Sequence, residues 1–267
     1  MVTGAADAAQ EISPVLGALI GGGVAAAATA AGCLPIYFVR TIPQRVQDAM
    51  LGFGAGVMLA ASAFSLALPG IDAAREAGHG VWMAGSIVSV AVLVGAGFLM
   101  LMEHLVPHEH FVKGPEGLSS QRLKRVWLFV FAICLHNVPE GLAIGVGFAS
   151  STAHGMTLAT GIAVQDLPEG LVVAVALLAV GYQRGLAVLV GMASGLVEPA
   201  GAVLGALIVV QFPLLLPIAL GFAAGAMLFV VSHEVIPESH GRGHENYATA
   251  GLVIGFVLMM LFDTAFG

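Results

Sequence analysis

The sequence contains very little charge. Asp, Glu, Lys and Arg make up only 9% of its 267 residues, whereas a soluble domain carries about 25%. Hydrophobic residues make up 58% of the chain, and the mean hydropathy is +0.98. This composition excludes an ordinary soluble domain. It predicts an all-α integral membrane protein, because helices satisfy their own backbone hydrogen bonds in lipid.

Other absences narrow the function. The only two cysteines, Cys33 and Cys134, lie far apart in apolar runs, which argues against a disulfide framework. Nine Lys and Arg residues form no basic patch for nucleic acid. Segment 1–13 lacks the basic start of a cleavable signal peptide, so we expect none. We expect a single transmembrane domain over residues 1–267, since no low-complexity stretch or soluble domain interrupts the chain.

Eight apolar stretches are long enough to cross a bilayer, for which a helix needs about 20 residues. The breaks between them carry proline, glycine or charged residues, and the longest connection is 107–125. The predicted spans are 12–37, 46–69, 81–106, 126–148, 154–181, 185–210, 213–236 and 247–266.

The basic residues predict the orientation of these spans. With eight spans, the loops 1–2, 3–4, 5–6 and 7–8 share one side, and they hold every Lys and Arg except Arg75. Loops rich in Lys and Arg face the cytoplasm. We therefore expect loop 107–125 to be cytoplasmic and both termini to lie outside. The basic residues on the cytoplasmic side are Arg40, Arg45, Lys113, Arg122, Lys124, Arg125, Arg184 and Arg242.

A repeated string suggests internal symmetry. Residues 52–59 (GFGAGVML) resemble residues 221–228 (GFAAGAML), and the two strings lie in spans that run in opposite directions. Similar sequence in opposite orientation indicates an inverted repeat, here of spans 1–3 and 6–8 around spans 4 and 5. The alternative is chance similarity between helices rich in small residues, since the chain has 36 glycines.

Two near-copies of a polar string interrupt apolar spans 4 and 5: residues 136–141 (HNVPEG) and 165–170 (QDLPEG). Charged side chains in a bilayer cost a few kcal/mol or more and usually face a bundle interior that binds something. Within each string the first and fifth residues share a helix face. Span 6 adds a further carboxylate before a proline. The predicted ligand set is His136, Asn137, Glu140, Gln165, Asp166, Glu169 and Glu198.

The backbone of these strings is also unusual. Each of Pro139, Pro168 and Pro199 deprives the carbonyl four residues earlier of its helical partner. Such a carbonyl must find a donor, a water or a cation in the membrane. The glycines that follow Glu140 and Glu169 let another backbone approach closely.

The residue types favour a divalent transition metal. One imidazole among carboxylates and amides suits zinc, cadmium, iron or manganese, whereas an all-oxygen site would favour magnesium or calcium. The alternatives are structural: carboxylates held neutral by hydrogen bonds, amides that join helices, and a histidine satisfied in the core.

Further polar residues could line an ion path. Glu103 near the end of span 3, and His233 and Glu234 near the end of span 7, lie toward the predicted cytoplasmic side. Met58 could offer a thioether, although a methionine in an apolar helix is core by default. Asp72 and Asp263 lie toward the predicted outer side. For the polar residues at helix ends, capping is the alternative interpretation.

The two strings together resemble the ZIP family of divalent metal transporters, and the QDLPEG form is similar to that of bacterial members of its GufA-like branch. The resemblance implies uptake of zinc, cadmium or iron-like ions toward the cytoplasm through a binuclear site on the ligand residues above. It also implies a 3+2+3 helix arrangement, an elevator-like movement of spans 1, 4, 5 and 6, a homodimer, and a place in the bacterial inner membrane.

Two other functions fit the sequence less well. An intramembrane metalloprotease would need an open metal position and a general base, and the chain lacks the His-Glu-x-x-His string. A metal sensor would need an output domain, which the sequence does not show. We therefore expect a transporter that is no enzyme and has no catalytic cofactor, with divalent metal ions and membrane lipid as its partners.

Overall fold

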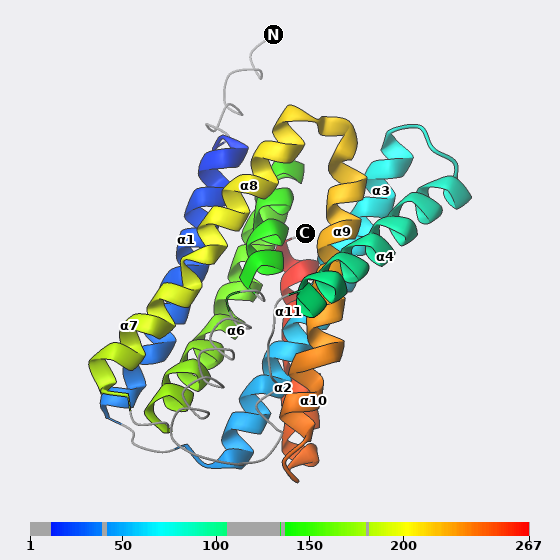
Figure 1. Cartoon of the computed structure of the whole chain (residues 1–267). Coiled ribbons are helices and arrows are strands. Elements are labelled where there is room, and N and C mark those ends of the chain that lie inside the picture. Colours follow the sequence, from blue (N-terminus) through cyan, green and yellow to red (C-terminus); the bar gives the residue numbers. More distant parts are fainter. Residues whose placement is uncertain (1–11, 39–41, 106–133, 135–136, 180–181, 267) are drawn as a thin grey trace.

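The computed structural model describes residues 12–38, 42–105, 134, 137–179 and 182–266. Over these residues the chain forms a helical bundle without strands (Figure 1). The α-helices are α1 (Pro14–Cys33), α2 (Gln44–Ala60), α3 (Leu68–Glu76), α4 (Val81–Leu105), α6 (Thr152–Ala179), α7 (Arg184–Gly195), α8 (Val197–Gln211), α9 (Leu216–Val230), α10 (Ile236–His240) and α11 (Glu245–Phe266), with a further helical segment over 137–150. Short 3-10 turns occupy Leu34–Tyr37 and Pro213–Leu215.

Seven helical stretches in the described residues are long and apolar enough to cross a membrane. They agree with seven predicted spans to within a few residues at most ends, and over the described residues they are consistent with an all-helical membrane protein. Of the predicted span 126–148, the structure describes Cys134 and the helix from residue 137 onward; loop 107–125 lies outside the described residues. The seven stretches are Pro14–Tyr37, Gln44–Glu76, Val81–Met102, Thr152–Leu178, Arg184–Gln211, Pro213–His240 and Glu245–Ala265.

The described basic residues separate between the two ends of the bundle. Arg45 and Arg184 lie at the starts of α2 and α7, and Arg242 lies between α10 and α11. These element ends lie at the same end of the bundle, whereas the last turn of α3, which contains Arg75, lies at the other (Figure 1). The charge asymmetry expected from the sequence is thus present, and which end faces the cytoplasm stays a prediction.

Two long spans change from α-helix to π-helix at matching places. The π segments Ala61–Ala67 and Val231–Val235 follow the strings 52–59 and 221–228. Each π segment is followed closely by a proline, Pro69 or Pro237, which lacks the N–H needed for an ordinary helical bond. Since π segments often occur at functional sites, both segments are candidates for such sites.

Glycines allow the helices to pack backbone to backbone. Helix α2 packs on α11, and a Cβ at Gly52 would collide with the carbonyl of Ala248. Helix α4 packs on α9, and a Cβ at Gly225 would collide with the carbonyl of Val92. Helix α1 packs against α6, α7 and α8, and α6 also contacts α2 and α11. Helix α6 therefore joins two sets of tightly packed helices.

Candidate metal centre

Polar side chains from three spans meet inside the bundle. They come from segment 137–150, from the middle of α6 and from the first turn of α8. Asn137, Glu140, Gln165, Asp166 and Glu198 are each at most 1% exposed, and Glu169 is half-buried. The structure therefore brings together six of the seven predicted ligands. The seventh, His136, lies outside the described residues.

Three carboxylates are close enough to share one ion. Glu140, Asp166 and Glu169 each offer an oxygen, and these oxygens all lie within 4.8 Å of one another. Two oxygens that bind one cation at about 2.0–2.4 Å are separated by no more than about 4.8 Å. The spacing of the three carboxylates therefore suits a common divalent cation.

Glu198 is held in place by donors from two other helices. The Thr29 hydroxyl of α1 donates to Glu198 Oε1 at 3.1 Å. Asn137 Nδ2 donates to the same oxygen at 3.3 Å and to the carbonyl of Ser194 at 2.9 Å. Ser194 lies where the span breaks at Leu196, between α7 and α8. The amide of Asn137 thus supports both the break and the carboxylate next to it.

The centre has a surplus of acceptors. Gln165 Nε2 donates to Glu140 Oε1, which fixes one oxygen of that carboxylate. Buried polar atoms usually have a partner, and leaving one without costs about 1–3 kcal/mol. Yet five buried oxygens here have no hydrogen-bond partner among the described residues: Asn137 Oδ1, Glu140 Oε2, Gln165 Oε1, Asp166 Oδ2 and Glu198 Oε2.

The negative charges of the centre, like its oxygens without partners, indicate a site for a cation. Glu140 lies close enough to Glu169 and Glu198 to be repelled by both, and Asp166 is repelled by all three. A cation among them removes this repulsion and supplies the missing partner of each oxygen. The arrangement can therefore bind a divalent metal through carboxylate and amide oxygens.

The glycines of the two Pro-Glu-Gly strings bring neighbouring backbones into contact. A Cβ at Gly141 would collide with the carbonyl of Glu198, and a Cβ at Gly170 would collide with the carbonyl of Thr29. Pro168 lies inside α6 without ending the helix. These glycines let α1 and α8 pack closely against the helices that carry the two strings.

The predicted path residues lie elsewhere. Met58 is 3% exposed within the main hydrophobic core, as its structural interpretation expects. His233 and Glu234 lie in the π segment of the seventh span, where the His233 ring stacks on Phe229 with centroids 5.1 Å apart. The side chain of Glu103 lies outside the described residues.

A second polar contact, which sequence reasoning missed, lies in the π segment Ala61–Ala67. The Ser65 hydroxyl donates to Asp263 Oδ1 at 2.7 Å, and a ring nitrogen of His154 contacts the Ser65 carbonyl. Pro69, four residues after Ser65, cannot give that carbonyl the donor of an ordinary α-helix. This proline was a signal that could have drawn attention to Ser65. Asp263, expected near the outer side, is thus joined to the second span through Ser65, which also contacts His154 of α6.

Comparison with known proteins identifies a family and several similar sequences. The sequence model of the family described as ZIP Zinc transporter matches residues 108–263. Similar proteins include zinc transporter ZIPB of Bordetella bronchiseptica, 53% identical over 94% of this chain and 81% of its own length. Zinc transporter GufA of Myxococcus xanthus is 42% identical over 91% of this chain and 96% of its length. Zinc transporter ZIP11 of Homo sapiens is 32% identical over 97% of this chain and 99% of its length. The chain belongs to the ZIP zinc transporter family, in its GufA-like branch.

Proposed function

We propose that this protein carries divalent transition-metal ions, above all zinc, across a membrane toward the cytoplasm. The observation that carries the proposal is the group of carboxylates and amides in which five buried oxygens, those of Asn137, Glu140, Gln165, Asp166 and Glu198, lack hydrogen-bond partners among the described residues. Relatives named zinc transporters support the choice of ion. Cadmium is the next candidate, followed by iron and manganese, because oxygen ligands with one adjacent imidazole accept all of them.

We propose that the centre holds two ions. The proposed ligands are His136, Asn137, Glu140, Gln165, Asp166, Glu169 and Glu198. A single zinc ion usually takes four ligands, so seven exceed its needs. Glu140 and Glu169 come from facing spans and each has two oxygens, which allows one of them to bridge a pair of ions.

An inverted repeat is supported by matching contacts. In this proposal spans 1–3 repeat as spans 6–8 with an offset of 169 residues, which is the separation of Thr29 from Glu198. A Cβ at Gly32 would collide with the backbone of Leu167. At the position 169 residues later, a Cβ at Gly201 would approach the carbonyl of Val138 at 3.2 Å. Val138 and Leu167 occupy the same place in their Pro-Glu-Gly strings.

The same repeat accounts for the larger pairings. The α2–α11 pair joins spans 2 and 8, and the α4–α9 pair joins spans 7 and 3. Exchanging the two halves converts one pair into the other. The two π segments also fall at the same register of the repeat. Together with an eighth span, predicted at 126–148, this pairing supports the proposed 3+2+3 arrangement.

Transport requires the centre to face each side of the membrane in turn. We propose that α1, α6, α7, α8 and the span containing 137–150 move as one unit against α2, α4, α9 and α11, since packing is tight within each set. The Ser65–Asp263 contact would meet the ion on the outer side, and His233 with Glu234 would meet it on the inner side. At the centre, carboxylate oxygens replace the water that the ion loses.

Uptake into sealed vesicles tests the proposal. Purified protein in liposomes should admit Zn²⁺ or Cd²⁺ to a trapped indicator, and Glu169→Ala should reduce the initial rate at least about tenfold. The matched control is Glu76→Ala, which removes an exposed carboxylate from the end of α3 and should leave the rate unchanged. Equal uptake by the unsubstituted protein, by Glu169→Ala and by empty liposomes would overturn the proposal.

A further inference from the structure

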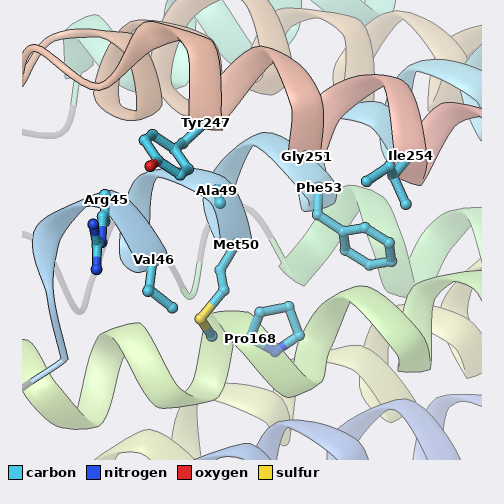
Figure 2. A pocket seen from close by; sticks show the side chains of 9 residues that line it. All are labelled: Arg45, Val46, Ala49, Met50, Phe53, Pro168, Tyr247, Gly251 and Ile254. Carbon is cyan, nitrogen blue, oxygen red and sulfur yellow. The ribbon is translucent and has the colours of Figure 1, made fainter.

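A cavity of about 330 Å³ lies between α2, α11 and α6, apart from the metal ligands (Figure 2). Its volume falls within the range of ligand pockets, about 300–1,000 Å³. Helix α2 supplies most of the lining residues, the neighbouring α11 supplies Tyr247, Gly251 and Ile254, and α6 contributes Pro168. The lining residues are Arg45, Val46, Ala49, Met50, Phe53, Pro168, Tyr247, Gly251 and Ile254.

The two ends of this cavity differ in chemistry. Arg45 and Tyr247 lie together at one end, with the phenol oxygen directed toward the Arg45 side, and Phe53 and Ile254 lie toward the other (Figure 2). The side chains between them are apolar. Arg45 is exposed and forms no ion pair with any carboxylate in the described part of the chain. A ligand that fits has one anionic group and one hydrocarbon tail.

The position of the cavity along the bundle identifies the source of such a ligand. Arg45 and Tyr247 lie in the first turns of α2 and α11, at the end of the bundle that carries the other described arginines except Arg75. Arginine and tyrosine at the end of a membrane span lie at the depth of lipid headgroups. Basic pockets between membrane helices bind anionic headgroups, while the hydrocarbon region beside them holds acyl chains.

We propose that this cavity binds one anionic phospholipid, with its phosphate at Arg45 and Tyr247 and one acyl chain between Val46, Met50 and Ile254. The guanidinium supplies a charge-assisted hydrogen bond to phosphate, and the phenol supplies a second donor. The acyl chain passes Phe53, which lines the apolar end of the cavity. This lipid contacts α6 at Pro168, directly before the ligand Glu169, and therefore links the α2–α11 pair to the helix of the metal centre. The site needs no metal and does not depend on the transport proposal.

Native mass spectrometry tests the site directly. Detergent-solubilised protein is mixed with equal amounts of phosphatidylglycerol and phosphatidylcholine of the same chain length. The unsubstituted protein should retain one phosphatidylglycerol with about fivefold preference over phosphatidylcholine. One basic residue near an anionic headgroup favours binding by about this factor. Arg45→Gln should remove the preference, and Val46→Trp should remove binding by filling the apolar wall.

Two matched variants separate the site from general effects. Arg184→Gln removes a cation from the same end of the bundle, and Val253→Trp adds an indole to an exposed position of α11 outside the cavity. Both should bind like the unsubstituted protein. Equal preference in Arg45→Gln and the unsubstituted protein, or its loss in Arg184→Gln, would overturn the proposal.

Crosslinking gives a readout without substitution. Phosphatidylglycerol with a photoreactive group at the middle of one acyl chain should label peptides that contain Phe53 or Ile254. Excess phosphatidylglycerol should suppress this labelling, whereas inorganic phosphate should leave it unchanged. Labelling spread evenly over lipid-facing peptides, or suppression by inorganic phosphate alone, would overturn the assignment of an acyl-chain site.

Discussion

Thr29 and Glu198 meet through a 3.1 Å hydrogen bond in which the hydroxyl donates to the carboxylate. The two residues are 169 positions apart, the same separation as Gly52 and Gly221. Under the proposed repeat they are equivalent positions of α1 and α8 that contact each other. One half of the repeat thus contributes an acid to the centre and the other half contributes the donor that orients it.

The first prediction concerns this donor. Thr29→Val keeps the shape of the side chain but removes the hydroxyl, so Glu198 Oε1 loses one of the two donors described above. A hydrogen bond to a charged group contributes about 1.5–3 kcal/mol, so we expect the initial rate of Zn²⁺ uptake to fall about tenfold. Thr29→Ser should keep most of the rate. A Thr29→Val variant as fast as the unsubstituted protein would show that this hydroxyl does not position Glu198.

Two adjacent glycines of α1 should respond in opposite ways. A Cβ at Gly22 would lie 2.6 Å from Pro199 Cα, whereas a Cβ at Gly23 would meet nothing within 4 Å. Gly22→Ala should therefore destabilise the protein by about 1–3 kcal/mol through overpacking. Gly23→Ala should be neutral or stabilise it slightly, since alanine favours helix. Thermal unfolding in detergent compares the two, and similar unfolding temperatures would contradict the close contact of α1 and α8.

Proton competition should weaken metal binding. Carboxylates bind a cation in their deprotonated form, and so does His136, whose reference pKa is about 6.5. Protons therefore displace the metal as the pH falls, and affinity should rise with pH. Titration calorimetry with Zn²⁺ should show progressively weaker binding below about pH 6. Binding that strengthens on acidification would exclude the proposed ligand set.

A buried ion-pair cluster should stabilise the end of the bundle that carries Arg45. Asp48 is fully buried and accepts hydrogen bonds from Gln44 Nε2 at 2.8 Å and from His244 Nδ1 at 3.0 Å, with Arg242 at 3.7 Å. Burial lowers the pKa of Arg242, and Asp48 opposes this shift by favouring the charged guanidinium. Removing one partner of a buried pair costs about 3–5 kcal/mol, so Asp48→Ala should lower the unfolding temperature markedly.

The control for this cluster is the exposed pair of Asp72 and Arg75, which lie 3.6 Å apart. Exposed pairs contribute about 0–1 kcal/mol, and Asp72→Ala should therefore change the unfolding temperature little. If Asp48→Ala and Asp72→Ala had equal effects, the buried cluster would contribute no more than an ordinary surface pair.

The candidate residues of the centre can be identified from the sequence because their determinants are local. Glu140 and Asp166 stand out as polar residues within apolar spans, and helix geometry alone places each on a face with its neighbours. The seven confirmed spans follow from runs of apolar residues for the same reason. No contact between helices is needed for either inference.

Other features depend on which helices touch. The residues around Thr29 form no polar motif that would indicate a role for it. In the sequence, only its separation of 169 residues from Glu198 relates it to the centre. His154 acquires a role because the start of α6 packs beside the π segment that contains Ser65. For the break at Leu196, the sequence indicates only that Pro199 leaves the carbonyl of Gly195 without its helical partner, and a proline does not fix the residue at which a helix ends.

Because the centre has a surplus of buried acceptors, the stability of the protein should depend on the concentration of metal available to it. A ligand that binds only the folded state stabilises it by RT ln(1 + [L]/Kd), about 2.7 kcal/mol at a hundredfold excess over Kd. The five oxygens without partners among the described residues make the unloaded fold the less stable one. Under zinc starvation the folded population should therefore open more often and become easier to degrade, so that the abundance of the protein itself reports on the zinc around it.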